Sequence, residues 1–136
     1  MLVLYVFKCD NPKLHDPERA KASFGDVVHF SRILEDRRLD LVTDHPAPWY
    51  GYIFSDEYLD DDAKKALPVF LASDQFDCLI LMKKIIVDGK MKVTQAPRIF
   101  RKDVKLMENT HIPENAQRLR FERMLDGWVL DDTSQT

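Results

Sequence analysis

The sequence predicts an α/β fold, a single domain with a mixed sheet flanked by helices. Short apolar runs rich in β-branched and aromatic residues recur along the chain, as buried strands do. Helix-start signals lie between several of these runs. The dipeptide Asp88-Gly89 separates two of them, which is typical of a tight hairpin turn. A length of 136 residues suits one domain, which we place at residues 1–130, with a flexible polar tail at 131–136.

The strands are expected where an apolar run ends at turn-forming residues. The first run stops at Asp10-Asn11-Pro12, and a later one, WYGYIF, stops at Ser55. The second of these predicts a central strand, because it is apolar or aromatic throughout apart from Gly51. The expected strands are residues 2–7, 26–30, 49–54, 77–87, 90–93 and 98–101.

Three helices are expected. Asp16 before Pro17 is a capping pattern for a short helix that ends near Gly25. Asp60-Asp61-Asp62 opens a second helix, in which Pro68 predicts a kink or a break. The last is an amphipathic helix at residues 114–126, stopped by Gly127, because apolar residues recur at i, i+3, i+4 and i+7. Those residues are Phe121, Met124, Leu125 and Trp128.

Composition and charge exclude several classes of protein. The chain has 20 basic and 23 acidic residues, without the Lys and Arg excess of most nucleic-acid-binding proteins. Its apolar runs, such as Cys78 to Met82, are far shorter than the ~20 residues of a membrane span. The N-terminus lacks the basic region of a signal peptide. Cys9 and Cys78 lie in apolar segments, which favours buried reduced thiols. We therefore expect a cytoplasmic protein.

One short segment suggests chemistry. Asp56 and Glu57 follow the strand at residues 49–54, so they are expected at the carboxyl-end edge of the sheet, where open α/β sheets bind ligands. Carboxylate oxygens there suit Mg²⁺ or Mn²⁺, which in turn would hold a diphosphate. The alternative is structural: the two carboxylates are a polar strand end, and residues 60–62 cap the next helix.

Three blocks in this order resemble family 2 glycosyltransferases. The string WYGYIFSDEYLDDD is similar to that family's apolar strand, Asp-x-Asp-Glu motif and acidic helix start. Gly89-Lys90 and then PRIFRK at residues 97–102 are similar to the family's turn and Pro-Arg-Leu-Phe-Arg-Lys string. The block NTHIPE at residues 109–114 matches a later Ile-His-Glu cluster. The resemblance covers residues 49–114, about half of the chain.

The resemblance implies a reduced GT-A-like architecture and metal-assisted transfer of a sugar from a nucleotide-sugar donor, expected to be UDP-linked, to an unknown acceptor. Asp56, Glu57 and His111 would hold Mn²⁺ or Mg²⁺. Asp10 would contact the base. Arg98 and Arg101 would lie near the phosphates, although an exposed strand face with alternating charge and bulk explains both arginines as well. Neither a catalytic base nor an oligomeric state is indicated.

Two departures from the family pattern leave a second hypothesis open. Phe54 occupies the position of the family's first Asp, and only 48 residues precede Trp49, fewer than the family's nucleotide-binding half needs. The alternative is therefore a non-catalytic binding or assembly module that keeps a reduced glycosyltransferase scaffold.

Overall fold

The structure is a computed structural model that describes residues 1–42 and 45–131. Within these ranges it contains two α-helices, four short 3-10 helices and seven strands. The helices are α1 (Pro17–Ala22) and α2 (Asp61–Leu71), and the 3-10 helices are η1 (Pro12–Leu14), η2 (Gly25–Val27), η3 (Leu39–Leu41) and η4 (Ala116–Arg118). The strands are β1 (Leu2–Phe7), β2 (Val28–Leu34), β3 (Trp49–Phe54), β4 (Glu57–Leu59), β5 (Cys78–Val87), β6 (Lys90–Arg101) and β7 (Phe121–Asp131).

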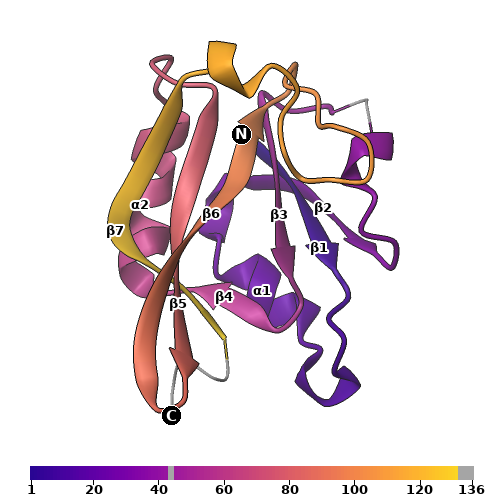
Figure 1. Ribbon diagram of the computed structural model, residues 1–136. Coiled ribbons are helices and arrows are strands. Elements are labelled where there is room, and N and C mark those ends of the chain that lie inside the picture. Colours follow the sequence, from indigo (N-terminus) through magenta and orange to yellow (C-terminus); the bar gives the residue numbers. More distant parts are fainter. Residues whose placement is uncertain (43–44, 132–136) are drawn as a thin grey trace.

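All seven strands form one mixed sheet in the order β2-β1-β3-β6-β5-β7-β4. β1 runs parallel to both β2 and β3, and β5 runs parallel to β7. β6 joins these two parts, because it pairs antiparallel with β3 on one side and with β5 on the other. Figure 1 shows the resulting curled sheet, with α2 behind β5 and β7 and α1 behind the lower part of the sheet. The predicted α/β class is confirmed.

The sheet has a core on each face. Alternate residues of β1 divide between them: Leu2, Leu4 and Val6 pack on the helix side, and Val3, Tyr5 and Phe7 pack on the other. The second face is covered by η3 and by the segment of residues 102–119, which is orange in Figure 1. A strand buried on both faces needs apolar residues throughout, which explains the uninterrupted apolar run of β1.

The local signals at the predicted turns and caps are confirmed. Asp16 and Asp60 each accept a hydrogen bond from the backbone N–H three residues later, at the starts of α1 and α2. The Asp88-Gly89 turn has positive φ at both residues, 53° and 72°, as a tight hairpin of this type requires. These elements depend on neighbours in the sequence, so the sequence alone predicts them.

Two predicted breaks are absent. The sequence predicted a kink at Pro68 or one helix ending and another starting there, and α2 continues through Pro68 as a single helix to Leu71, so the second alternative is wrong. The predicted strands at residues 90–93 and 98–101 are one continuous strand, β6. Pro97 is tolerated within β6 because β3 pairs only with the last part of this strand, from Ile99 onward.

The predicted C-terminal helix is wrong: its second half is strand β7, and only η4 is helical in the first half. Met124 is buried, but Leu125, one residue on, is 73% exposed, as alternation along a strand requires. β5 needs a partner for its outer edge, and β7 supplies it from Phe121 to Met124. The pairing resumes at Lys83 with Val129, so residues 125–128 bulge out of the ladder.

The predicted tail at 131–136 is described only at its first residue. Asp131 belongs to β7 and pairs with Glu57, and residues 132–136 lie outside the described part of the chain. Cys9 and Cys78 are buried free thiols. Among the described residues, no helix is long and apolar enough to cross a membrane.

Candidate functional site

The segment that suggested chemistry forms a tight turn between two strands. β3 ends at Phe54, Ser55 and Asp56 make the turn, and β4 begins at Glu57. The Glu57 side chain points inward and is fully buried. Its Oε1 accepts a hydrogen bond from the backbone N–H of Phe54 at 2.9 Å, which closes the turn. The two neighbouring carboxylates of the sequence therefore have different environments.

Glu57 is held by two cations. Arg98 donates to both carboxylate oxygens, Nη1 to Oε1 at 2.8 Å and Nη2 to Oε2 at 3.0 Å, and Lys83 donates to Oε2. Lys83 also pairs with Asp131 at 3.2 Å. Burial alone would raise the pKa of Glu57, but the charges and hydrogen bonds of Arg98 and Lys83 outweigh burial and lower the pKa to about 2. Glu57 is therefore ionised and has little capacity for another ligand.

The two arginines of the PRIFRK block support the fold. Arg98 is buried, and its guanidinium lies 4.8 Å from the centre of the Tyr52 ring. Arg101 donates to the backbone carbonyls of Phe76 at 2.8 Å and Ser73 at 2.7 Å, and it lies 4.2 Å from the Trp49 ring centre. Arg101 thus ties the segment after α2 to the end of β6. Both were expected near phosphates, and both have protein partners instead.

Asp56 remains partly exposed at the carboxyl end of β3. Burial, followed by the nearby charge of Glu57, raises the pKa of its carboxyl group. Its backbone carbonyl accepts a hydrogen bond from Arg19 at 3.4 Å. Asp56 is therefore the partly exposed member of the acidic pair, and its carboxylate has no side-chain hydrogen-bond partner among the described residues.

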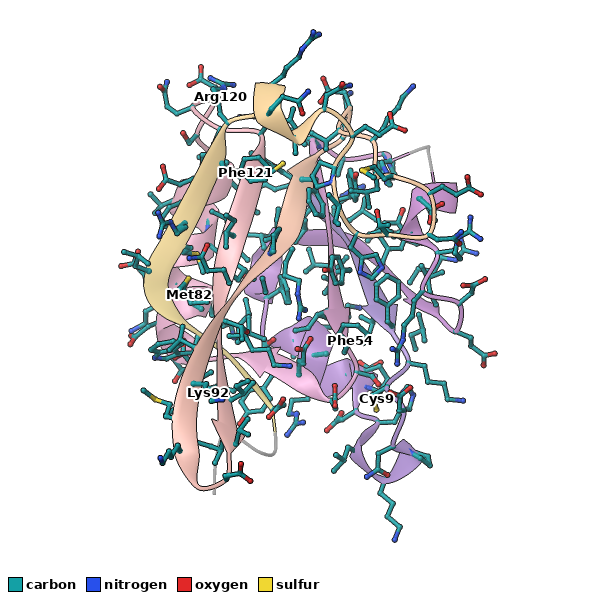
Figure 2. All side chains as sticks on the ribbon, in the orientation of Figure 1. Cys9, Phe54, Met82, Lys92, Arg120 and Phe121 are labelled. Carbon is teal, nitrogen blue, oxygen red and sulfur yellow. The ribbon has the colours of Figure 1, made fainter. Side chains whose placement is uncertain are left out.

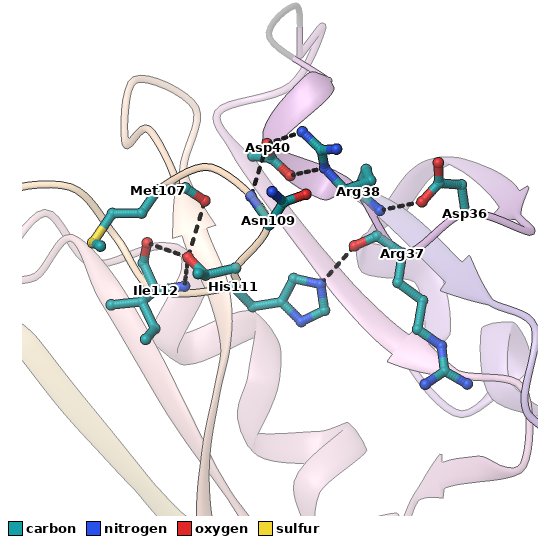
Figure 3. A network of polar contacts seen from close by, with 9 residues as sticks. Asp36, Arg37, Arg38, Asp40, Met107, Asn109, His111 and Ile112 are labelled. Carbon is teal, nitrogen blue, oxygen red and sulfur yellow. Dashed lines mark hydrogen bonds and ion pairs between the residues drawn. The ribbon is translucent and has the colours of Figure 1, made fainter.

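His111 fastens a covering segment to the sheet. Its ring stacks on Phe7, with ring centres 5.1 Å apart, and tilts against Tyr52 at 4.4 Å. Its Nε2 donates to the backbone carbonyl of Arg37 at 2.9 Å, as Figure 3 shows. Asp40 reinforces this junction by accepting from Arg38 and from the backbone N–H of Asn109. The histidine joins residues 102–119 to the loop after β2.

Asp10 lies at the carboxyl end of β1 and pairs with Arg37 at 2.8 Å. The Arg37 guanidinium also lies 4.8 Å from the centre of the Phe54 ring. Arg37 therefore links three parts of the carboxyl-end edge, namely Asp10 after β1, Phe54 at the end of β3 and His111 from the covering segment. Figure 2 labels Cys9 and Phe54 close together at this edge.

Sequence reasoning missed two residues that organise this region. Arg37 follows β2 just as Asp10 follows β1, so its position after a strand could have marked it as a candidate site residue. Lys83 directly follows the apolar run CLILM of β5 and is only partly exposed. A partly buried lysine in a strand needs a carboxylate partner, but the sequence does not say which acidic residue supplies it.

The residues present do not fit a divalent cation. Glu57 is occupied by Arg98 and Lys83, and the Nε2 of His111 is occupied by a carbonyl group. Within residues 1–42 and 45–131, no three His, Cys, Asp or Glu side chains gather in a way that could hold a metal ion. The structure therefore does not bring Asp56, Glu57 and His111 together as a ligand set.

A separate cavity of about 510 Å³ lies near the start of β3. Its walls come from η3, from Tyr50 and from the segment after β6, and His45 stacks on Tyr50 with ring centres 3.8 Å apart. None of the residues that the sequence singled out for a site lines it.

Comparisons with known proteins find matches among solved structures only. No family model matches the chain, and no curated protein matches it. Among solved structures, a protein from Bacillus anthracis assigned as a glucose-1-phosphate thymidylyltransferase, in complex with a sucrose, is similar at a TM-score of 0.45 and 15% identity. The match covers 96% of this chain and 70% of that chain. A likeness at this level carries no argument about function.

Proposed function

We propose that this protein is a non-catalytic binding module on a reduced nucleotide-sugar transferase scaffold. The observation that carries the proposal is the state of Glu57. In the motif that the sequence resembles, this carboxylate belongs to the donor site, whereas here Arg98 and Lys83 neutralise it inside the protein. With Phe54 in place of the preceding Asp, only Asp56 of the acidic motif stays available.

The ligand proposed for this module is a nucleotide sugar, bound through its phosphates at the carboxyl-end edge of β1 and β3. Arg37 supports this choice because its side chain is 42% exposed and its position is set by the Phe54 ring. Its carboxylate partner, Asp10, is almost fully exposed, so a phosphate can replace it at little energetic cost. The carboxyl ends of parallel strands are also the usual ligand site of open α/β sheets.

Metal-assisted glycosyl transfer to an unknown acceptor is the second candidate, and Asp56 favours it. Its partly exposed carboxylate follows the carboxyl end of β3, as a transferase of this type would need. A single carboxylate is a weak cation site. Binding of Mn²⁺ or Mg²⁺ would therefore have to depend on the nucleotide sugar.

Calorimetric titration with UDP-glucose separates the two candidates. The binding module predicts the same affinity in MnCl₂ and in EDTA, no release of UDP over time, and weaker binding after Arg37→Gln. The exposed Arg123 of β7 provides the matched control, and Arg123→Gln should bind as the parent does. Binding that disappears in EDTA and in Asp56→Asn, together with UDP release, would establish the transferase instead.

A further inference from the structure

The β5–β6 hairpin extends beyond the sheet as a two-stranded arm. β7 accompanies β5 only as far as Lys83, and β3 accompanies β6 only from Ile99 onward. Among the described residues, 84–87 and 90–93 therefore pair only with each other. We call residues 84–95 the arm. Figure 1 shows this ribbon continuing past β4 to the lower end of the molecule, and Lys92 is labelled on it in Figure 2.

The arm is charged differently from the rest of the protein. It contains Lys84, Lys90 and Lys92 and a single acidic residue, Asp88, so its formal charge is +2. The whole chain carries −3, which leaves −5 for the other residues. A basic arm on an otherwise acidic protein is attracted to an anionic surface, so the protein would approach such a surface with the tip of the arm first.

The lysines alternate with exposed apolar side chains. Lys90 pairs across the ladder with Val87, Lys92 with Ile85 and Lys84 with Val93. Met91 is 56% exposed and Val93 44% exposed, and Val87 beside the turn is exposed as well. Each such pair places an ammonium group and an aliphatic group at the same distance from the tip of the arm. Both groups can then contact a surface whose outer layer is charged and whose interior is apolar.

We propose that the arm docks on a membrane surface containing anionic phospholipid. The lysines would contact the headgroup phosphates, and Val87, Met91 and Val93 would enter the boundary with the acyl chains. The base of the arm is rigid, because Lys83 is fixed by Glu57 and Asp131. The acidic body would then stay away from the membrane while the tip contacts it.

Two other occupants fit the arm less well. Nucleic acid would leave the exposed aliphatic side chains without a role, and the arm has neither an arginine nor an aromatic residue for bases. A strand from a second copy would have to approach edges that carry lysines, which is how proteins discourage such pairing. The combination of ammonium and aliphatic groups favours the lipid interface.

Co-sedimentation with vesicles tests this proposal on the full chain. Binding is expected to vesicles that mix phosphatidylcholine with phosphatidylglycerol, and not to phosphatidylcholine alone. The double variant Lys90→Gln, Lys92→Gln should lower the partition coefficient by about tenfold or more, and Met91→Ser should lower it several-fold. Raising NaCl from about 0.1 M to about 1 M should release the protein.

The control variant removes two lysine charges from a part of the protein outside the arm. Lys64 and Lys65 are exposed on α2, so Lys64→Gln, Lys65→Gln should partition as the parent does. Equal losses in both double variants would overturn the proposal, because they would reflect net charge alone. It would also be overturned if the parent ignored anionic vesicles, bound duplex DNA or RNA through the arm lysines instead, or formed a dimer that the arm variants dissolve. All variants should unfold at the parent's temperature.

Discussion

Glu57 shows how one buried side chain can control the charge of its surroundings. Its carboxylate has no contact with solvent, so its ionised form depends wholly on Arg98, Lys83 and the Phe54 N–H. Arg98 depends on Glu57 in return, since it too is buried. Removal of either partner leaves an uncompensated charge in the interior, which is far less favourable than loss of a surface ion pair.

Glu57→Gln is expected to lower the free energy of unfolding by about 3–5 kcal/mol, because it keeps the shape of the side chain but leaves Arg98 without a counter-ion. Urea denaturation measures this change. Glu122 is exposed on β7, so Glu122→Gln should alter the free energy of unfolding by less than about 0.5 kcal/mol. Similar midpoints for the two variants would contradict the buried ion pair.

Lowering the pH should destabilise the protein, because it protonates the Glu57 carboxylate. The pKa of Glu57 is lowered from 4.5 to about 2, so its stabilisation is complete above pH 4.5 and is lost as the pH falls through 2. The difference corresponds to about 3 kcal/mol. Asp56 acts in the opposite direction, because its raised pKa favours the folded form as it protonates.

The measurement is the free energy of unfolding at several pH values, from urea titrations between pH 6 and pH 2. The parent should lose about 3 kcal/mol more than Glu57→Gln over this interval. Parallel curves for the two proteins would mean that Glu57 does not change its proton affinity on folding.

At the scale of elements, β7 is the strand whose path differs most from its local sequence signals. Its first part completes the edge of β5, and its last part pairs with β4. Between them, residues 125–128 bulge across the beginning of α2. The bulge is possible because Gly127 has a φ of +95°, and a Cβ there would lie 2.3 Å from the backbone nitrogen of Ala63.

Met124 and Leu125 distinguish the strand from a helix. In the predicted helix both would lie on the apolar face, whereas in β7 Met124 is 2% exposed and Leu125 is 73% exposed. Met124→Ala should therefore lower the free energy of unfolding by about 2–5 kcal/mol, and Leu125→Ala by less than about 0.5 kcal/mol. Equal, large losses in urea denaturation would support the helix.

Gly127 and Gly89 form a matched pair for backbone strain. Both have positive φ, but a Cβ at Gly89 meets nothing within 4 Å, while one at Gly127 meets the start of α2. Gly89→Ala should lower the free energy of unfolding by about 1–2 kcal/mol. Gly127→Ala should lower it by roughly 3 kcal/mol or more, since strain and a steric clash add. Thermal unfolding compares the two, and equal losses would show that the bulge does not approach α2.

At the scale of the whole molecule, pairing between distant parts of the chain holds the sheet together. Leu2 pairs with Trp49, and Cys78 pairs with Phe121. The β5–β6 hairpin is the one local pair of long strands among the described residues. β6 pairs with one strand of each parallel part and so joins them into one sheet. Without β6, each part would have an open strand edge.

This topology predicts slow refolding. Most strand pairs close long loops before they gain contacts, so refolding from urea should have a half-time between roughly 1 ms and 1 s. Fluorescence of the buried Trp49 in a stopped-flow experiment reports the rate. Refolding within microseconds would indicate that local elements, and not the distant strand pairs, limit the reaction.

The candidate site illustrates what sequence motifs leave open. The sequence placed Asp56 and Glu57 correctly at the end of a buried strand. It did not reveal that Glu57 turns inward, because its cations, Lys83 and Arg98, come from other strands of the sheet. A motif specifies residue types and spacing, but the availability of a carboxylate depends on which charges the fold brings to it.

The sequence by itself determined the elements whose stability is local. The apolar runs of β1, β3 and β5, the caps at Asp16 and Asp60 and the Asp88-Gly89 turn depend on neighbours in the chain and on backbone preferences. Only the tertiary structure decided that residues 121–131 are a strand and that Glu57 is an internal counter-ion. Both outcomes depend on partners far along the chain, because an open strand edge and a buried charge are satisfied by whatever the fold places beside them.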